Sequence, residues 1–262
     1  MSAAMPATLR QGWAVHLDAL SKTFPGQEQP ALQSLRATFA PARVTGLVGP
    51  DGSGKTTLMR IIAGLMQANS GAVLIQHGER HVSSAEAKAS LGYMPQRFGL
   101  YEDLTVQENL VLNADLRIVP QELRAAKFET LLAFTDLKRF VDRYAGKLSG
   151  GMKQKLGLAC ALIAAPSVLL LDEPSVGVDP ISRRELWRMV RELAGEGMTV
   201  VWSTSYLDEA QRCDDVVLMN HGHILFQGEP GMFSRRCDGR VFLVSVPAED
   251  KRSTLKRFAR AS

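Results

Sequence analysis

Several features are scarce in this sequence of 262 residues, and each absence excludes a class of protein. The three cysteines lie far apart and no histidine spacing matches them, so neither a disulfide framework nor a zinc site is predicted. The apolar stretch 156–171 contains no charged residue, but it is shorter than the roughly 18 to 20 apolar residues of a membrane helix. The first residues contain no apolar run typical of a secretory signal. We therefore expect a folded protein that stays in the cytosol and has no membrane span.

A strong net charge is also absent from most of the chain. Hydrophobic residues make up 45% and charged residues 22% of the sequence, and the net charge is +4. Beyond Phe233 basic residues outnumber acidic ones by five, so the preceding part carries a net charge of −1. A domain that binds nucleic acid would carry a basic stripe on its folded part. We therefore expect no nucleic-acid partner.

Hydrophobic patterning predicts an α/β fold. Helix-like stretches separate four short apolar segments, which is typical of a parallel sheet covered on both faces; these segments are 44–48, 168–171, 198–202 and 216–219. Helices are predicted at 55–66, 105–116 and 120–134, the second opened by a capping box of Thr105 and Glu108. The segment 97–160 is expected to form a helical insertion. One domain is expected over 1–238, and a linker or further β/α domain is expected to begin at 239–262, with a strand at 241–246.

A glycine-rich loop follows the first of these strands. Residues 49–56 read Gly-Pro-Asp-Gly-Ser-Gly-Lys-Thr, which fits the pattern GxxxxGK[ST] in its usual position between a strand and a helix. The glycines allow successive backbone N–H groups to surround a phosphate, and the helix N-terminus adds positive charge. Lys55 would reach the outer phosphates, and Thr56 would offer its hydroxyl to Mg²⁺. An ordinary glycine turn is the alternative, and the lysine, the threonine and both flanking elements argue against it.

Two further motifs could act on a phosphate. Asp172 and Glu173 follow the strand 168–171, where one acid can hold a metal ion and the next can polarise an attacking water; a capping role is the alternative. Residues 148–154, Leu-Ser-Gly-Gly-Met-Lys-Gln, precede an apolar helix predicted at 152–163. The head of that helix offers a second cluster of free N–H groups, although a plain N-capped helix explains this segment equally well.

The order of the motifs resembles a known family. In their order and wording, four motifs resemble those of the nucleotide-binding domain of ABC transporters. They are the glycine-rich loop, Gln96 after Tyr93-Met-Pro, the signature segment 148–154, and the segment 171–179 with Leu-Asp-Glu-Pro and Ser-Val-Gly-Val-Asp. The resemblance covers about residues 16–231. It implies a P-loop NTPase fold of ABC type, with a central, mostly parallel sheet, an antiparallel β subdomain and an inserted helical subdomain. It also implies that a second nucleotide-binding domain, fused or identical, clamps ATP and Mg²⁺ head to tail against this one.

The resemblance also implies roles for individual residues. Glu173 matches the general base, and Asp172, Thr56 and Gln96 match the residues around Mg²⁺. Phe24 matches the aromatic residue that stacks on adenine, for which a place in the core is the alternative. The residues expected to bind nucleotide are Phe24, Gly49, Pro50, Asp51, Gly52, Ser53, Gly54, Lys55, Thr56 and Thr57 in one domain and Ser149, Gly150, Gly151, Gln154 and Asp179 toward the nucleotide of the other. This reading requires that Gly151 meets a second domain rather than packing inside its own chain.

Two further sequence segments indicate a subgroup of this family. The segments 98–110 and 177–187 resemble the ATPases of ABC-2-type exporters, among them chains with two fused nucleotide-binding domains. This resemblance implies an ATP-hydrolysing subunit at the cytoplasmic face of the inner membrane, which energises export through integral-membrane permease subunits. The alternatives are a non-catalytic half that only completes the partner's site, and a soluble ABC protein without a transport role.

One position departs from the family pattern. The family places a histidine against the γ-phosphate where this chain has Ser205, and none of its five histidines falls near that position in the sequence. Serine is shorter than histidine and cannot become charged. We therefore expect Ser205 to be a weakened catalytic position and the nucleotide at this site to turn over slowly or not at all. The alternative is that Tyr206 or a water fills the role.

Overall fold

The computed structural model describes residues 12–96 and 99–232. The chain divides into two units, Met1–Pro230 and Gly231–Ser262, and the fold below is that of the described residues of the first unit. The predicted linker at 239–262 and its strand at 241–246 lie outside the described residues.

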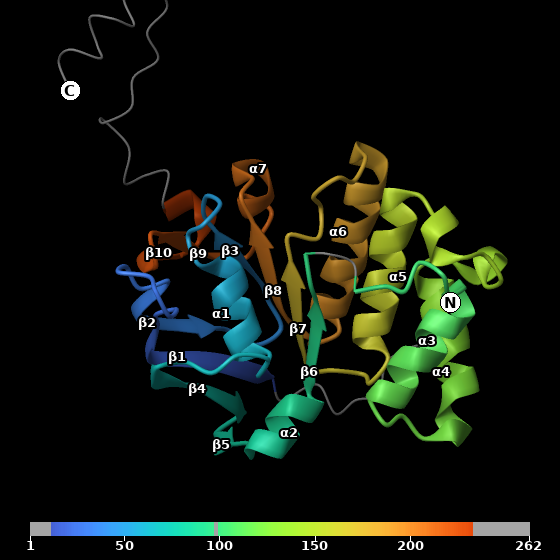
Figure 1. Cartoon of the computed structure of the whole chain (residues 1–262), viewed down its shortest axis with the longest axis horizontal. Coiled ribbons are helices and arrows are strands. Elements are labelled where there is room, and N and C mark those ends of the chain that lie inside the picture. The colour runs from blue at the N-terminus through green and yellow to red at the C-terminus, as the bar shows by residue number, and fades with distance from the viewer. Residues whose placement is uncertain (1–11, 97–98, 233–262) are drawn as a thin grey trace, which may run out of the picture. The chain divides into compact units, whose positions relative to one another are not determined.

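A six-stranded sheet forms the centre of the unit (Figure 1). Its strand order is β10-β9-β3-β8-β7-β6, with parallel pairing throughout except between β10 and β9. The strands are β3 (Val44–Val48), β6 (Leu91–Met94), β7 (Val168–Asp172), β8 (Thr199–Thr204), β9 (Asp215–Asn220) and β10 (His223–Gly228). Every residue of β3, β7 and β8 is buried. This explains why they are continuous apolar runs and confirms the predicted parallel sheet.

A second, antiparallel sheet packs with α1 (Lys55–Ile62) over one face of the first sheet. Its order is β2-β1-β4-β5, made by β1 (Trp13–Lys22), β2 (Leu32–Phe39), β4 (Ser70–His77) and β5 (Arg80–His81). The short helix α2 (Ser84–Ala89) follows β5. Helix α1 was predicted to reach residue 66 but ends at Ile62, because Gly64 adopts a left-handed backbone (φ 71°) that stops the helix.

The opposite face of the central sheet packs against α6 (Pro180–Gly195) and part of α5 (Gly150–Leu162). Trp187 of α6 stacks on Trp202 of β8 with ring centroids 4.2 Å apart. Helix α5 begins two residues before its predicted start, because Ser149 accepts a hydrogen bond from the N–H of Met152 and caps the helix. The short helix α7 (Leu207–Ala210) follows β8.

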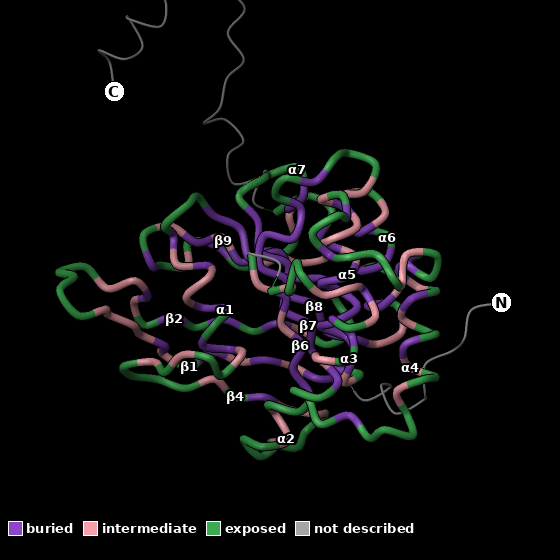
Figure 2. Tube along the Cα trace, turned by 45° about the vertical axis from the view of Figure 1, so that its right-hand side comes forward, coloured by how far each residue is buried: buried purple, intermediate pink, exposed green. Residues whose placement is uncertain are grey.

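The predicted insertion is a helical lobe beside the sheets (Figure 1). It contains α3 (Val106–Leu116), α4 (Gln121–Phe134), the 3-10 turns η2 (Lys138–Phe140) and η3 (Ala145–Lys147), and α5. Figure 2 shows buried segments along these helices, and their side chains form a separate apolar cluster. The predicted capping box of Thr105 and Glu108 is confirmed. Across the described residues, no helix combines the length and the apolar character that a bilayer crossing demands.

Candidate nucleotide-binding site

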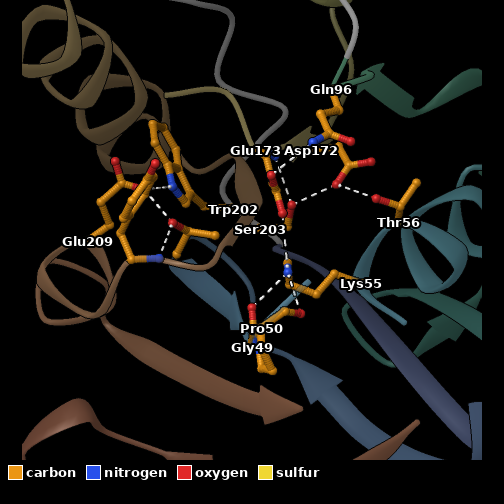
Figure 3. A network of polar contacts seen from close by, with 12 residues as sticks. Gly49, Pro50, Lys55, Thr56, Gln96, Asp172, Glu173, Trp202, Ser203 and Glu209 are labelled. Carbon is orange, nitrogen blue, oxygen red and sulfur yellow. Dashed lines mark hydrogen bonds and ion pairs between the residues drawn. The ribbon is translucent and has the colours of Figure 1, made fainter. Parts of the chain in front are cut away.

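The loop between β3 and α1 forms a phosphate cradle. Gly52 and Gly54 adopt positive φ angles of 77° and 104°, which favour glycine. A Cβ on Gly54 would also lie 2.6 Å from the backbone oxygen of Ala31. The ammonium of Lys55 donates to the backbone oxygens of Gly49 at 2.7 Å and Pro50 at 3.1 Å (Figure 3). The buried hydroxyl of Ser53 has no hydrogen-bond partner among the described residues. A cradle with this unpaired hydroxyl fits a phosphate.

Asp172 lies at the end of β7, directly beside the start of α1. Its Oδ1 accepts hydrogen bonds from the hydroxyls of Thr56 at 3.2 Å and Ser203 at 2.7 Å. Its Oδ2 accepts from the hydroxyl of Tyr93 at 3.3 Å. The structure therefore brings together the hydroxyl and the carboxylate that were predicted separately at residues 56 and 172. Hydroxyl and carboxylate oxygens are ligands that suit Mg²⁺.

Glu173 connects the cradle with the segment that follows β6. Its Oε1 lies 3.2 Å from Nζ of Lys55, and its Oε2 accepts a hydrogen bond from Nε2 of Gln96 at 3.0 Å. Its backbone is left-handed with φ 49°, an unusual conformation for a residue other than glycine. Such strain is often found at functional sites. The predicted base and the predicted glutamine are thus in direct contact (Figure 3).

An open cavity of about 450 Å³ lies in front of these residues. Phe24 lines it, with the ammonium of Lys22 5.5 Å from its ring centroid. This placement favours the ligand-facing interpretation of Phe24 over the core alternative. His221 also lines the cavity, although nothing in the local sequence indicates it. The turn between β9 and β10 brings it there, because the N–H of Gly222 bonds to the backbone oxygen of Ser53 at 3.1 Å.

The signature segment divides into an exposed and a buried part. Ser149 is exposed and Gly150 is half-buried, so both lie at the surface. Gly151 is buried instead, and a Cβ on it would lie 2.1 Å from Oγ of Ser182 in α6. Gln154 is also buried. The missing side chain of Gly151 allows α5 and α6 to approach each other within one chain, and its contact with a second domain stays a prediction. An interdomain contact from this segment would involve Ser149 and Gly150.

Asp179 and Ser205 lie apart from the cavity lining. Asp179 caps α6 by accepting the N–H groups of Ile181 and Ser182, both at 3.0 Å. The side chain and N–H of Ser182 hold the pKa of Asp179 below its ordinary value. Ser205 is exposed at the end of β8. Tyr206 beside it is half exposed, with the guanidinium of Arg183 5.4 Å from its ring centroid.

The contact between Tyr93 and Asp172 predicts an unusual titration. Desolvation, together with the nearby Asp172 carboxylate, raises the pKa of Tyr93 to about 12. Because the unfolded tyrosine ionises near pH 10, the stabilisation from neutral Tyr93 is present below pH 10 and is lost between pH 10 and 12. In an ultraviolet titration of phenolate absorbance, we expect one of the four tyrosines to ionise late. Tyr93→Phe should remove that late phase, and its persistence would contradict the assignment.

A cradle between a parallel strand and a helix, facing an acidic strand end across a shared cavity, defines a P-loop nucleotide-binding domain. The family described as "ABC transporter" matches residues 32–176. The chain belongs to this family, whose nucleotide-binding domain binds ATP.

Individual proteins show the same likeness. "Probable multidrug ABC transporter ATP-binding protein YbhF" of Escherichia coli (strain K12) is 58% identical over 243 residues, which are 93% of this chain and 42% of the relative. This chain thus spans less than half the length of that relative. "Nod factor export ATP-binding protein I" of Rhizobium sp. (strain N33) is 34% identical over 83% of this chain and 71% of the relative. A dimeric ATP-binding cassette solved with ADP and Pi shares the fold, with a TM-score of 0.72 at 24% identity over 82% of this chain and 98% of that chain.

Proposed function

We propose that the chain is the ATP-binding and ATP-hydrolysing domain of an ABC-2-type exporter. One observation carries the hydrolytic part of the proposal. Glu173 reaches both the phosphate-cradle lysine and Gln96, while the adjacent Asp172 holds the hydroxyl of Thr56. A base and a metal-binding pair thus lie at the open end of a phosphate cradle, which is the arrangement that phosphoryl transfer to water requires.

The residues around Asp172 fit a magnesium ion. The Thr56 hydroxyl and the Asp172 carboxylate lie 3.2 Å apart, and the Gln96 amide oxygen could add a third ligand. When bound, Mg²⁺ would neutralise charge that develops on the phosphates. Lys55 and the loop N–H groups would bind the phosphates, and Glu173 would accept a proton from the attacking water. Phe24 would stack on the adenine at the other end of the cavity.

Hydrolysis in this proposal requires a second nucleotide-binding domain, either fused or a second copy. Ser149 and Gly150 lie at the surface at the start of α5, where free N–H groups could meet the γ-phosphate held by the other domain. The dimeric cassette with the same fold supports this arrangement. The named exporter relatives support a role in export with integral-membrane permease subunits, and hence a peripheral place at the cytoplasmic face of the inner membrane.

A second candidate function rests on Ser205. If no residue replaces the missing histidine, this domain binds ATP and completes the partner's site but hydrolyses its own nucleotide slowly. Restoring one fixed contact to the developing phosphoryl charge is worth about a hundredfold in rate. In the complete protein with both nucleotide-binding domains, we expect Ser205→His to raise the rate of ATP hydrolysis at this site by up to about a hundredfold. An unchanged rate of ATP hydrolysis would show that Ser205 does not limit catalysis.

The proposed function is tested first by nucleotide binding and then by coupling. The purified chain should bind a fluorescent ATP analogue in the presence of Mg²⁺, and Lys55→Ala should abolish that binding. Coexpression with the membrane proteins encoded beside it should yield a complex whose ATP hydrolysis exceeds that of the isolated chain. Failure to bind any adenine nucleotide would contradict the proposal.

A further inference from the structure

One buried hydroxyl joins both acids of the site and belongs to none of the predicted motifs. Ser203, on β8, is completely buried. Its Oγ donates a hydrogen bond to Oδ1 of Asp172 at 2.7 Å and accepts one from the N–H of Glu173 at 2.8 Å (Figure 3). A hydroxyl has only one proton to donate. Because that proton goes to Asp172 while the oxygen accepts from Glu173, the two contacts together fix the orientation of the Ser203 hydroxyl.

One contact of Ser203 holds the backbone of Glu173, and the other orients the carboxylate of Asp172. Glu173 has a left-handed backbone with φ 49°, a strained conformation that persists only where the surroundings hold it. The hydrogen bond from its N–H to Ser203 helps to hold that conformation and so directs the side chain toward Lys55 and Gln96. At Asp172, Ser203 and Thr56 donate to the same carboxylate oxygen. Ser203 therefore fixes the rotation of the carboxylate that is expected to hold the metal.

The position of Ser203 is itself fixed by its neighbours on β8. It pairs in register with Leu47 of β3 and with Asp172 of β7, so it lies between the strand that leads to the cradle and the strand that carries the acids. On either side, Trp202 and Thr204 donate to the buried carboxylate of Glu209, at 3.0 Å and 2.7 Å. The end of β8 is thus anchored on one side to Glu209 and on the other to the catalytic acids.

We propose that Ser203 is a positioning residue, which orients the Asp172 carboxylate for Mg²⁺ and holds the strained backbone of Glu173. It acts through these two residues and does not itself contact nucleotide. The inference rests on the proposed function, since it assigns Asp172 to the metal and Glu173 to the base. Removing a group that orients a metal ligand typically weakens metal affinity about 10–100-fold.

The test uses Ser203→Ala in the full chain, with a fluorescent ATP analogue as the probe. We expect nucleotide affinity in EDTA to stay unchanged, and the Mg²⁺ concentration that gives half of the metal-dependent gain to rise at least about tenfold. We also expect the amide hydrogen of Glu173 to exchange faster with solvent in the absence of nucleotide, because its acceptor is gone. Ser203→Cys, which fills similar space with a weak donor, should shift the Mg²⁺ titration in the same direction.

The control is Thr45→Val, which removes another completely buried hydroxyl from the same sheet. Oγ1 of Thr45 has no hydrogen-bond partner among the described residues, so we expect neither the Mg²⁺ titration nor the Glu173 exchange to change. A purely structural role for Ser203 would lower the stability of both Ser203 variants and leave the Mg²⁺ midpoint in place, and that result would overturn the inference. If the wild-type chain itself fails to bind Mg²⁺ and nucleotide, the proposed function fails instead.

Discussion

Replacing Glu173 by glutamine is expected to lower ATP turnover about 10²–10⁴-fold, the usual contribution of a general base. The amide keeps the size of the side chain but cannot accept a proton from water. Nucleotide affinity should be retained, because the cradle contacts of Lys55 do not depend on the acid. We therefore expect the variant to accumulate with ATP bound and, under the proposed mechanism, to form stable ATP-dependent dimers.

Single-turnover hydrolysis and size-exclusion chromatography with and without ATP measure the two effects. Glu192→Gln is the matched control, since Glu192 is a partly exposed acid on α6 that pairs with Arg188 at 3.4 Å. It makes the same chemical change outside the site. A Glu173→Gln protein that hydrolyses ATP at the wild-type rate would remove Glu173 from the role of base.

Truncating Trp202 to alanine is expected to lower the free energy of unfolding by about 3–5 kcal/mol. The indole is completely buried, stacks on Trp187 at 4.2 Å and donates to the carboxylate of Glu209 at 3.0 Å. Its loss leaves a cavity between β8 and α6 and takes one donor away from a buried acid. Urea unfolding followed by circular dichroism measures the change.

Two comparisons separate packing from hydrogen bonding. Trp202→Phe retains an aromatic ring but not the N–H, so its loss of stability should lie well below that of Trp202→Ala. Leu225→Ala removes an apolar side chain that is 57% exposed and should change stability by less than about 0.5 kcal/mol. Equal effects of Trp202→Ala and Leu225→Ala would show that the stacked pair does not support the core.

The sequence alone predicts the elements whose pattern is local. The strands β3 and β7 are apolar throughout because both faces are covered. The capping box at Thr105 and Glu108 marks the start of α3 correctly. The cradle is likewise predictable, since Lys55 bonds to backbone oxygens only five and six residues away. The acidic strand end is predictable from its place after an apolar strand, although the partners of its acids are distant in the sequence.

Elements that depend on distant contacts were missed or misplaced. The strand predicted at 198–202 extends to Thr204, because the polar side chains of Ser203 and Thr204 are paired with buried acids and so do not end the strand. The burial of Gly151 depends on Ser182 of another helix, which no local pattern indicates. His221 reaches the cavity only through a turn that packs on the cradle. Such relations require the tertiary structure.

The helical lobe has its own apolar interior, in which Leu110 and Leu132 are buried, and a bridge between Thr105 and Tyr144 joins distant parts of its chain. The phosphate cradle and its acids, by contrast, lie at the ends of β3 and β7 beside the end of β8, and within the lobe only the start of α5 is proposed to reach a nucleotide. Sequence drift within the lobe can therefore be absorbed by compensating changes in the same interior. A protein built in this way can diversify the surface of one lobe over evolutionary time while its nucleotide chemistry remains constant.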